Sequence, residues 1–194
     1  SCVALQSIIN RFGSDVIAAF TATSRIEQLV QQPYNSLATA LATFAAQNIG
    51  AGNPERVRRG FRKSTFLVIV FSVIMCGIMF LSGEAFVRLF VKDANVIAIG
   101  GRAIRITSLF YIPLGMIYIT RSLLNGAGDS AFAFVSGLAE VVGRVGFSIL
   151  LAGIPALGYW AVWYTTGLTW LITGAACILR YLQGKWERIV LVEK

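Results

Sequence analysis

The sequence predicts an all-α, polytopic membrane protein. Hydrophobic residues make up 56% of its 194 residues and charged residues only 13%, whereas soluble domains carry about 25% charged residues. The apolar residues fall in long runs that short loops separate. Backbone polar groups in hydrocarbon must be satisfied within their own segment, and these runs are too long and too uniformly apolar for barrel strands. We therefore expect a bundle of membrane-spanning helices.

Five segments are long enough to cross a bilayer, which takes about 20 mostly apolar residues. The first contains Pro33, where we expect a helix kink because proline removes a backbone donor. A sixth apolar run, residues 2–9, is too short to cross and is predicted to be the end of another helix. We therefore expect residues 1–194 to form a single lobe of a longer protein. The five predicted spans are residues 16–46, 65–81, 96–124, 131–152 and 159–182.

Basic residues cluster in alternate loops. Residues 53–63 and the residues after the last span are strongly basic, whereas the charges of residues 83–95 cancel and residues 153–158 carry none. Basic loops stay on the cytoplasmic side, so we expect the C-terminus in the cytoplasm. The loop at 53–63 could instead bind anionic lipid headgroups or nucleic acid. Its shortness favours the topological interpretation, and we expect the lipid bilayer, not nucleic acid, as a partner.

The first predicted span carries a row of polar residues along one side. At about 100° per residue, its members fall within an arc of roughly 120°. Interhelical hydrogen bonds in membranes contribute only about 0.6 kcal/mol on average, so a row this long favours the wall of a substrate pathway over helix–helix contact. The row comprises Thr21, Arg25, Gln28, Gln32, Asn35, Thr39, Thr43 and Gln47.

Charged residues also lie at membrane depth outside this row. Glu27 is roughly 80° away from it, and we consider it either a coupling-ion site or the partner of a basic residue on another span. Glu140 and Arg144 are four residues apart on one predicted helix. That spacing predicts an ion pair within the membrane.

Small and hydroxyl-bearing residues mark the last two predicted spans. Glycines permit close approach between membrane helices, so we expect tight contacts at Gly137, Gly143, Gly146, Gly167 and Gly174. Threonines on one side of the last span either face the pathway or bond within their own helix. These are Thr165, Thr166, Thr169 and Thr173.

The chain lacks the motifs of an enzyme. It contains no His, and no glycine-rich phosphate loop, metal-binding motif or nucleophile–base arrangement is present. The three cysteines have neither zinc-site nor disulfide spacing. We therefore expect no catalytic residue, no metal and no cofactor.

Several motifs, in their order and spacing, resemble the C-terminal half of the multidrug and toxic compound extrusion (MATE) family. The resemblance covers essentially the whole chain, from the end of the seventh family helix through the twelfth. The motifs are Asn10-Arg11-Phe12-Gly13, residues 16–19, Arg25-Ile26, Gln31-Gln32-Pro33, residues 47–52, Pro113-Leu114-Gly115 and residues 123–129.

The resemblance implies an antiporter in the cytoplasmic membrane that exports organic, often cationic, compounds in exchange for protons or sodium ions. It also implies two six-helix lobes around a central cavity, of which the N-terminal lobe is absent from these residues. NorM-like members carry acidic residues in their seventh and tenth helices. In this chain the first position would precede Ser1, and the second falls near Leu114, which cannot bind a cation.

Two other functions stay open. A flippase for lipid-linked oligosaccharides would share the lobed architecture, but its anionic substrate favours a strongly cationic cavity, whereas only Arg25 is basic in the polar row. A membrane scaffold or inactive remnant is the third possibility. We favour the exporter.

Overall fold

The computed structural model describes residues 12–154 and 156–187, and this part of the chain is all-α, as predicted. It has six α-helices, two single-turn 3₁₀ helices and no strand. The predicted helix end at residues 2–9 lies outside the described residues. The helices are α2 (Ser14–Gly50), α3 (Pro54–Arg88), α4 (Ala94–Ser108), α5 (Tyr111–Gly126), α6 (Ser130–Ala152), η1 (Gly158–Trp160), α7 (Ala161–Leu182) and η2 (Lys185–Glu187).

Local sequence explains where α3 and α4 begin. Asn53 caps α3, since its side chain accepts a hydrogen bond from the backbone N–H of Arg56 at 3.2 Å. Pro54 follows at the start of the helix, where its missing N–H has no intrahelical partner to lose. Gly52 has a φ of 70°, which an L side chain rarely adopts. Asp93 caps α4 by accepting two backbone N–H groups.

The third predicted span, residues 96–124, is not one helix, and this prediction was wrong in that respect. It is divided into α4 and α5, which are bent by 55° relative to each other. Pro113 is the third residue of α5, and its ring nitrogen cannot donate to the carbonyl four residues earlier. A tighter turn closes the break, because the N–H of Phe110 donates to the carbonyl of Thr107 at 2.9 Å.

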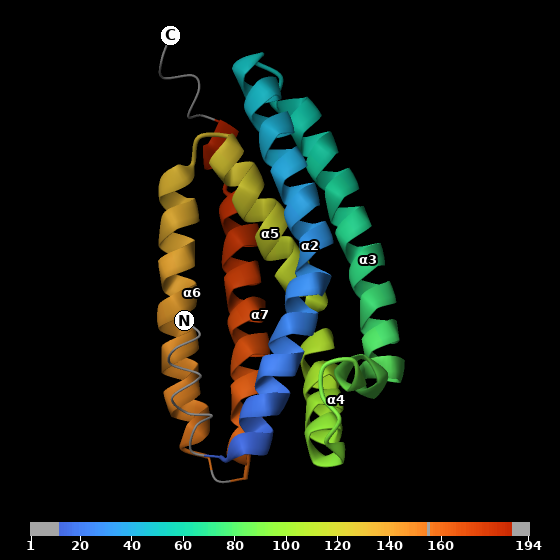
Figure 1. Cartoon of the computed structure of the whole chain (residues 1–194). Coiled ribbons are helices and arrows are strands. Elements are labelled where there is room, and N and C mark those ends of the chain that lie inside the picture. The colour runs from blue at the N-terminus through green and yellow to red at the C-terminus, as the bar shows by residue number, and fades with distance from the viewer. Residues whose placement is uncertain (1–11, 155, 188–194) are drawn as a thin grey trace.

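Three described helices, α3, α6 and α7, are each long and apolar enough to cross a membrane, and the bent pair α4 and α5 qualifies as a fourth span. The longest helix, α2, has 37 residues but falls outside this set, because its polar row lowers its hydropathy. It continues through Pro33 without interruption. Figure 1 shows that α2 changes direction along its length.

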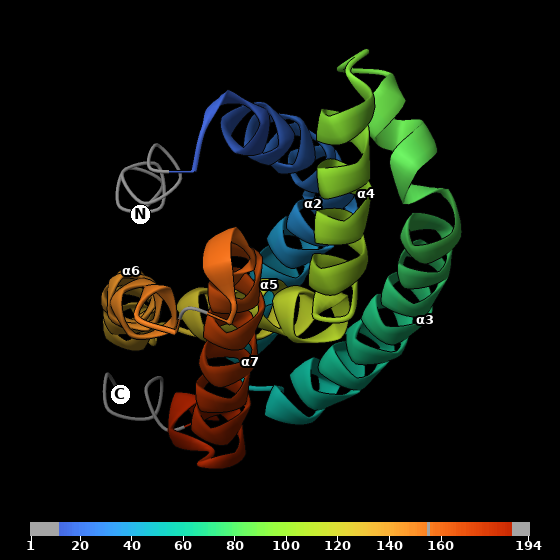
Figure 2. The ribbon, with the colours of Figure 1, turned by 90° about the horizontal axis from the view of Figure 1, so that it is seen from below.

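The bundle is organised around α5, which packs against α2, α3, α6 and α7. Figure 2 shows α6 at the edge of the bundle, on the opposite side of α7 from α3. The α2–α3 loop and the end of α7 lie at one end of the bundle, and the α6–α7 loop lies at the other (Figure 1). An ion pair of 2.6 Å between Arg58 and Glu187 joins the two basic segments.

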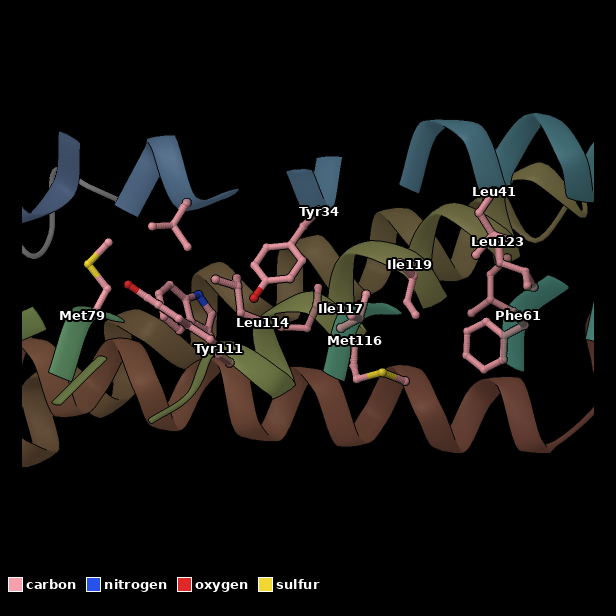
Figure 3. Close-up of a cluster of buried hydrophobic side chains, with 14 of the residues drawn as sticks. Tyr34, Leu41, Phe61, Met79, Tyr111, Leu114, Met116, Ile117, Ile119 and Leu123 are labelled. Carbon is pink, nitrogen blue, oxygen red and sulfur yellow. The ribbon is translucent and has the colours of Figure 1, made fainter. Parts of the chain in front are cut away.

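A buried cluster fixes α5 against α2 and α3. Tyr34 and Tyr111 are both 1% exposed, and Figure 3 shows them within this cluster. The hydroxyl oxygens of Tyr34 and Ser72 are 2.7 Å apart, and the Ser72 hydroxyl donates to the carbonyl of Tyr111 at 3.2 Å. Gly115 permits this approach, because a Cβ there would lie 2.5 Å from a methyl group of Val68. α2 and α5, which carry most of the candidate site, are thus packed together.

Candidate functional site

A cleft of about 460 Å³ lies between α2, α5, α6 and α7. Small-molecule sites usually have volumes of about 300–1,000 Å³. The wall combines carboxylates, guanidinium groups, amides and aromatic rings. Its residues are Phe20, Ser24, Glu27, Gln28, Gln31, Asn35, Leu114, Ile117, Tyr118, Arg121, Ser122, Glu140, Arg144, Thr166 and Trp170.

Glu140 binds two arginines in this cleft. Arg144 Nη2, one turn further along α6, donates to Glu140 Oε1 at 3.0 Å. Arg121 Nη2 on α5 donates to Glu140 Oε2 at 2.9 Å. The exposed fractions of the three side chains are 27% for Arg121, 20% for Glu140 and 14% for Arg144. Since two guanidinium groups share one carboxylate, the cluster carries one net positive charge.

Glu27 contributes a second carboxylate to the cleft, from α2. The residue is half-buried, and its Oε1 atom is buried with no hydrogen-bond partner among the described residues. The carboxylate interacts with the hydroxyl of Thr107 and, electrostatically, with Arg144. Glu27 and Glu140 balance Arg121 and Arg144, so these four groups have no net charge when all are ionised.

Aromatic and amide groups complete the wall. The Tyr118 hydroxyl donates to Gln31 Oε1 at 2.9 Å and so connects α5 to α2. Trp170, which is 4% exposed, presents an indole ring from α7. Leu114 is also 4% exposed and gives the α5 wall an apolar surface. Aromatic faces beside a few polar groups are typical of sites for small amphiphilic molecules.

All eight residues of the predicted polar row are exposed, on one face of α2. Three of its hydroxyl groups donate to backbone carbonyls one turn earlier: Thr21 at 2.9 Å, Thr39 at 3.0 Å and Thr43 at 3.2 Å. Among the described residues, no hydrogen bond joins the row to another helix. The row therefore forms an open polar face on this chain.

The polar row and the cleft share two residues, Gln28 and Asn35. Glu27, Glu140 and Arg144 lie in the cleft but outside the row. The other predicted pathway residues are on the open face of α2 and not in the cleft wall: Thr21, Arg25, Gln32 and Thr39.

Sequence reasoning missed several residues of the cleft. Arg121 could have been predicted, because it is the one charged residue of α5 and ionisable residues at membrane depth usually face a bundle interior or a cavity. Tyr118 and Trp170 could not have been predicted from the sequence, since aromatic residues in an apolar run are equally typical of core packing. Of the threonines expected on α7, Thr166 lines the cleft, whereas Thr165 is buried with an exposed fraction of 0%.

The cleft offers oxygen donors from carboxylate, amide and hydroxyl groups. Such donors bind protons or hard cations and do not suit soft metals. Within residues 12–154 and 156–187, no group of three or more His, Cys, Asp or Glu side chains is placed to hold a metal ion.

The sequence matches a known family model and several curated proteins. The MatE family model matches residues 2–150. A probable multidrug resistance protein, YpnP, of Bacillus subtilis is 26% identical over 190 residues, which are 97% of this chain and 42% of that protein. An FAD transporter of Shewanella oneidensis is 25% identical over 178 residues, covering 89% of this chain and 38% of that protein. The chain thus spans less than half the length of these curated relatives.

Solved structures share the fold. A MATE crystal structure in the bent conformation has a TM-score of 0.88 at 18% identity, and the match covers 98% of this chain and 43% of that one. A transporter of the MOP superfamily from Pyrococcus furiosus, whose binding pocket is described as having reverse polarity, has a TM-score of 0.87 at 19% identity. That match covers 96% of this chain and 42% of the solved chain.

Proposed function

The chain belongs to the MatE family of membrane transporters, and we propose that it forms the C-terminal lobe of an exporter of small organic compounds. One observation carries this proposal: the polar face of α2 is open along its length and meets the cleft at Gln28 and Asn35. Polar side chains at membrane depth need a polar partner or water. An N-terminal lobe, from the same polypeptide or another copy, faces this surface and encloses a central pathway.

We propose that the lobes work by alternating access. A ligand shifts such an equilibrium only as far as it binds the two arrangements with different affinity. Substrate and coupling ion must therefore contact groups whose surroundings change between the two states. The open face of α2 satisfies this requirement, because its contacts depend on the position of the opposing lobe.

Glu27 is our candidate for the coupling-ion site. Its Oε1 atom is buried without a hydrogen-bond partner among the described residues, so it can accept a proton or a sodium ion without breaking a described hydrogen bond. Leu114 leaves the α5 wall of the same cleft without a carboxylate. Glu140 suits the role less well, because both of its oxygen atoms accept hydrogen bonds from arginine.

Charge balance favours exchange of an organic cation against the coupling ion. With Glu27 ionised, the four charged groups of the cleft sum to zero and the carboxylate is available to a cation, in a cleft that the Trp170 ring also lines. When Glu27 takes up a proton or sodium ion, the cleft gains one positive charge and the organic cation is released. One ligand thus excludes the other, as antiport requires.

We place the protein in the cytoplasmic membrane with its C-terminus inside. The basic segment predicted as a loop forms the first turns of α3, and these turns lie with the end of α7 at one end of the bundle (Figure 1). Segments rich in Lys and Arg stay in the cytoplasm during insertion.

Replacement of Gln32 by leucine in the complete transporter tests the proposal. Gln32 is exposed on the open face of α2, and its amide donates only to the carbonyl of Gln28 at 3.4 Å among the described contacts. Gln32→Leu should lower export of a cationic dye while the amount of protein in the membrane stays constant. The matched control, Gln183→Leu, makes the same chemical change at an exposed position that follows α7. Equal export by both variants and the parent would contradict the pathway.

A flippase or exporter of anionic amphiphiles is the second candidate. Three guanidinium groups favour it: Arg121 and Arg144 in the cleft, and Arg25 on the polar row. Similarity to the Shewanella oneidensis FAD transporter also favours an anionic substrate, because FAD is an anion. Two results together would favour this candidate over the cation exporter. The purified protein would bind a lipid-linked phosphate saturably, and the transporter would have no effect on the tolerance of cells to cationic compounds.

A further inference from the structure

A groove of about 650 Å³ lies between α2 and the first turns of α3, away from the cleft. One wall is basic and comes from α3, with Arg56, Arg59 and Lys63. The other wall is apolar and comes from α2, with Leu37, Ala40 and Phe44. The residues on each wall are spaced three or four apart, so each wall is one face of its helix.

The Phe44 ring forms part of the groove wall. A Cβ at Gly60 would lie 2.5 Å from Phe44 Cε1, so the ring is seated directly on the backbone of α3. The Arg56 guanidinium is 5.8 Å from the centroid of the same ring. A cation is therefore held in the groove wall by a contact that leaves its N–H donors available to an anion.

The basic wall has more positive charge than the described carboxylates neutralise. Arg58 pairs with Glu187 at 2.6 Å, and Arg59 pairs with Glu55 at 3.5 Å. Arg56 and Lys63 form no ion pair with any described residue. Membrane insertion in the correct orientation requires only that such charges be present in the cytoplasmic segment. Here they also form one side of a groove.

The groove lies at the level where a bilayer changes from headgroups to hydrocarbon. α3 has 35 residues, a length of about 50 Å, against a hydrocarbon core of about 30 Å. Its exposed apolar side chains begin one turn after Lys63, with Phe66 at 66% and Leu67 at 54% exposed. The basic wall is thus at the height of lipid phosphates, and the apolar surface below it faces acyl chains.

We propose that this groove binds an anionic phospholipid of the surrounding leaflet. Arg56, Arg59 and Lys63 bind the headgroup phosphate, and an acyl chain lies along Leu37, Ala40 and Leu67. This site is independent of the proposed transport function, because none of these residues lines the cleft.

Native mass spectrometry of the complete protein with dioleoyl phosphatidylglycerol or dioleoyl phosphatidylcholine tests the site. The parent should retain the anionic lipid preferentially, and a combined Arg56→Gln, Arg59→Gln and Lys63→Gln variant should bind it about tenfold more weakly or less. Arg88→Gln, Lys92→Gln and Lys185→Gln together remove the same charge from exposed positions elsewhere. That charge-matched control should bind like the parent.

A second variant separates the groove from general charge attraction. Ala40 is exposed in the groove, so Ala40→Phe should fill it while keeping every charge, and should also weaken phosphatidylglycerol binding. Binding unaffected by Ala40→Phe, or weakened equally by the charge-matched control, would overturn the proposal. Displacement of the lipid by millimolar inorganic phosphate would also overturn it, because the groove would then be a simple anion site.

Discussion

The Arg121 guanidinium on α5 lies 2.9 Å from Glu140 Oε2 on α6. α6 is less buried than the other two single-helix candidate spans, α3 and α7. This contact therefore ties a peripheral helix to the central one, in the wall of the cleft. Since Arg144 occupies the other carboxylate oxygen, loss of Arg121 leaves Glu140 with a single described partner.

We predict that Arg121→Met destabilises the protein by about 1 to 3 kcal/mol, because it removes a charged hydrogen bond from a mostly buried carboxylate. Thermal unfolding of the purified protein measures the effect. Arg105→Met provides the comparison, since the Arg105–Glu84 pair has a similar length of 3.1 Å but its side chains are 38% and 43% exposed. That change should cost less than about 1 kcal/mol. Equal losses would show that burial does not govern these pairs.

Gly126→Ala should destabilise the protein, whereas Gly137→Ala should not. A Cβ at Gly126 would lie 2.3 Å from the backbone carbonyl oxygen of Ala42, so α5 and α2 would have to separate. Overpacking of this kind costs about 1 to 3 kcal/mol. A Cβ at Gly137 meets nothing within 4 Å, and alanine there improves helix propensity. Thermal unfolding separates the two, and a stable Gly126→Ala variant would contradict the close contact.

Glu27→Gln should remove the dependence of export on the ion gradient. Glutamine mimics the protonated state and cannot alternate between charged and neutral forms, so the cleft keeps one net positive charge. Dye efflux from vesicles with an imposed proton or sodium gradient measures the effect. The gradient that drives dye export by the unsubstituted transporter identifies the coupling ion.

Glu84→Gln is the control for this experiment. Glu84 pairs with Arg105 outside the cleft, and its neutralisation should leave gradient-driven export intact. Full coupling in the Glu27→Gln variant would exclude Glu27 as the ion site.

The helical bundle followed from hydropathy and charge, because those patterns act locally along the chain. The break at residues 109–110 was less evident: Pro113 was visible, but an apolar run continues on both sides of it. A proline can kink a helix or divide it, and the packing of α4 against α3 and of α5 against α2 selects between these outcomes here.

Contacts between distant segments could be predicted only in part. The Glu140–Arg144 spacing anticipated the ion pair of 3.0 Å, whereas Arg121 joined it from another helix. The glycines divide in the same way. Gly167 lies against Phe110 and Gly174 against Pro113, as expected of close helix contacts. The expectation was wrong for the three glycines of α6, because a Cβ at Gly137 or Gly146 would meet nothing within 4 Å and one at Gly143 would meet only a side chain of α6 itself. Sequence shows which residues are small, but tertiary structure decides which of them meet a neighbour.

The proposed pathway requires that water reaches the polar face of α2, and thiol labelling measures this. The complete protein is first freed of its native cysteines, including Cys2, Cys76 and Cys177. Gln32→Cys then places a thiol on the polar row, and Val73→Cys places one on the α3 surface, where Val73 is 56% exposed among apolar side chains. A charged, membrane-impermeant methanethiosulfonate reports which thiol water reaches, because only the hydrated thiolate reacts.

We predict that the Gln32→Cys variant reacts about tenfold faster or more than the Val73→Cys variant, and that a transported cation slows the reaction. Equal rates, or a Gln32→Cys variant that stays unlabelled in every gradient, would contradict a water-filled pathway along α2.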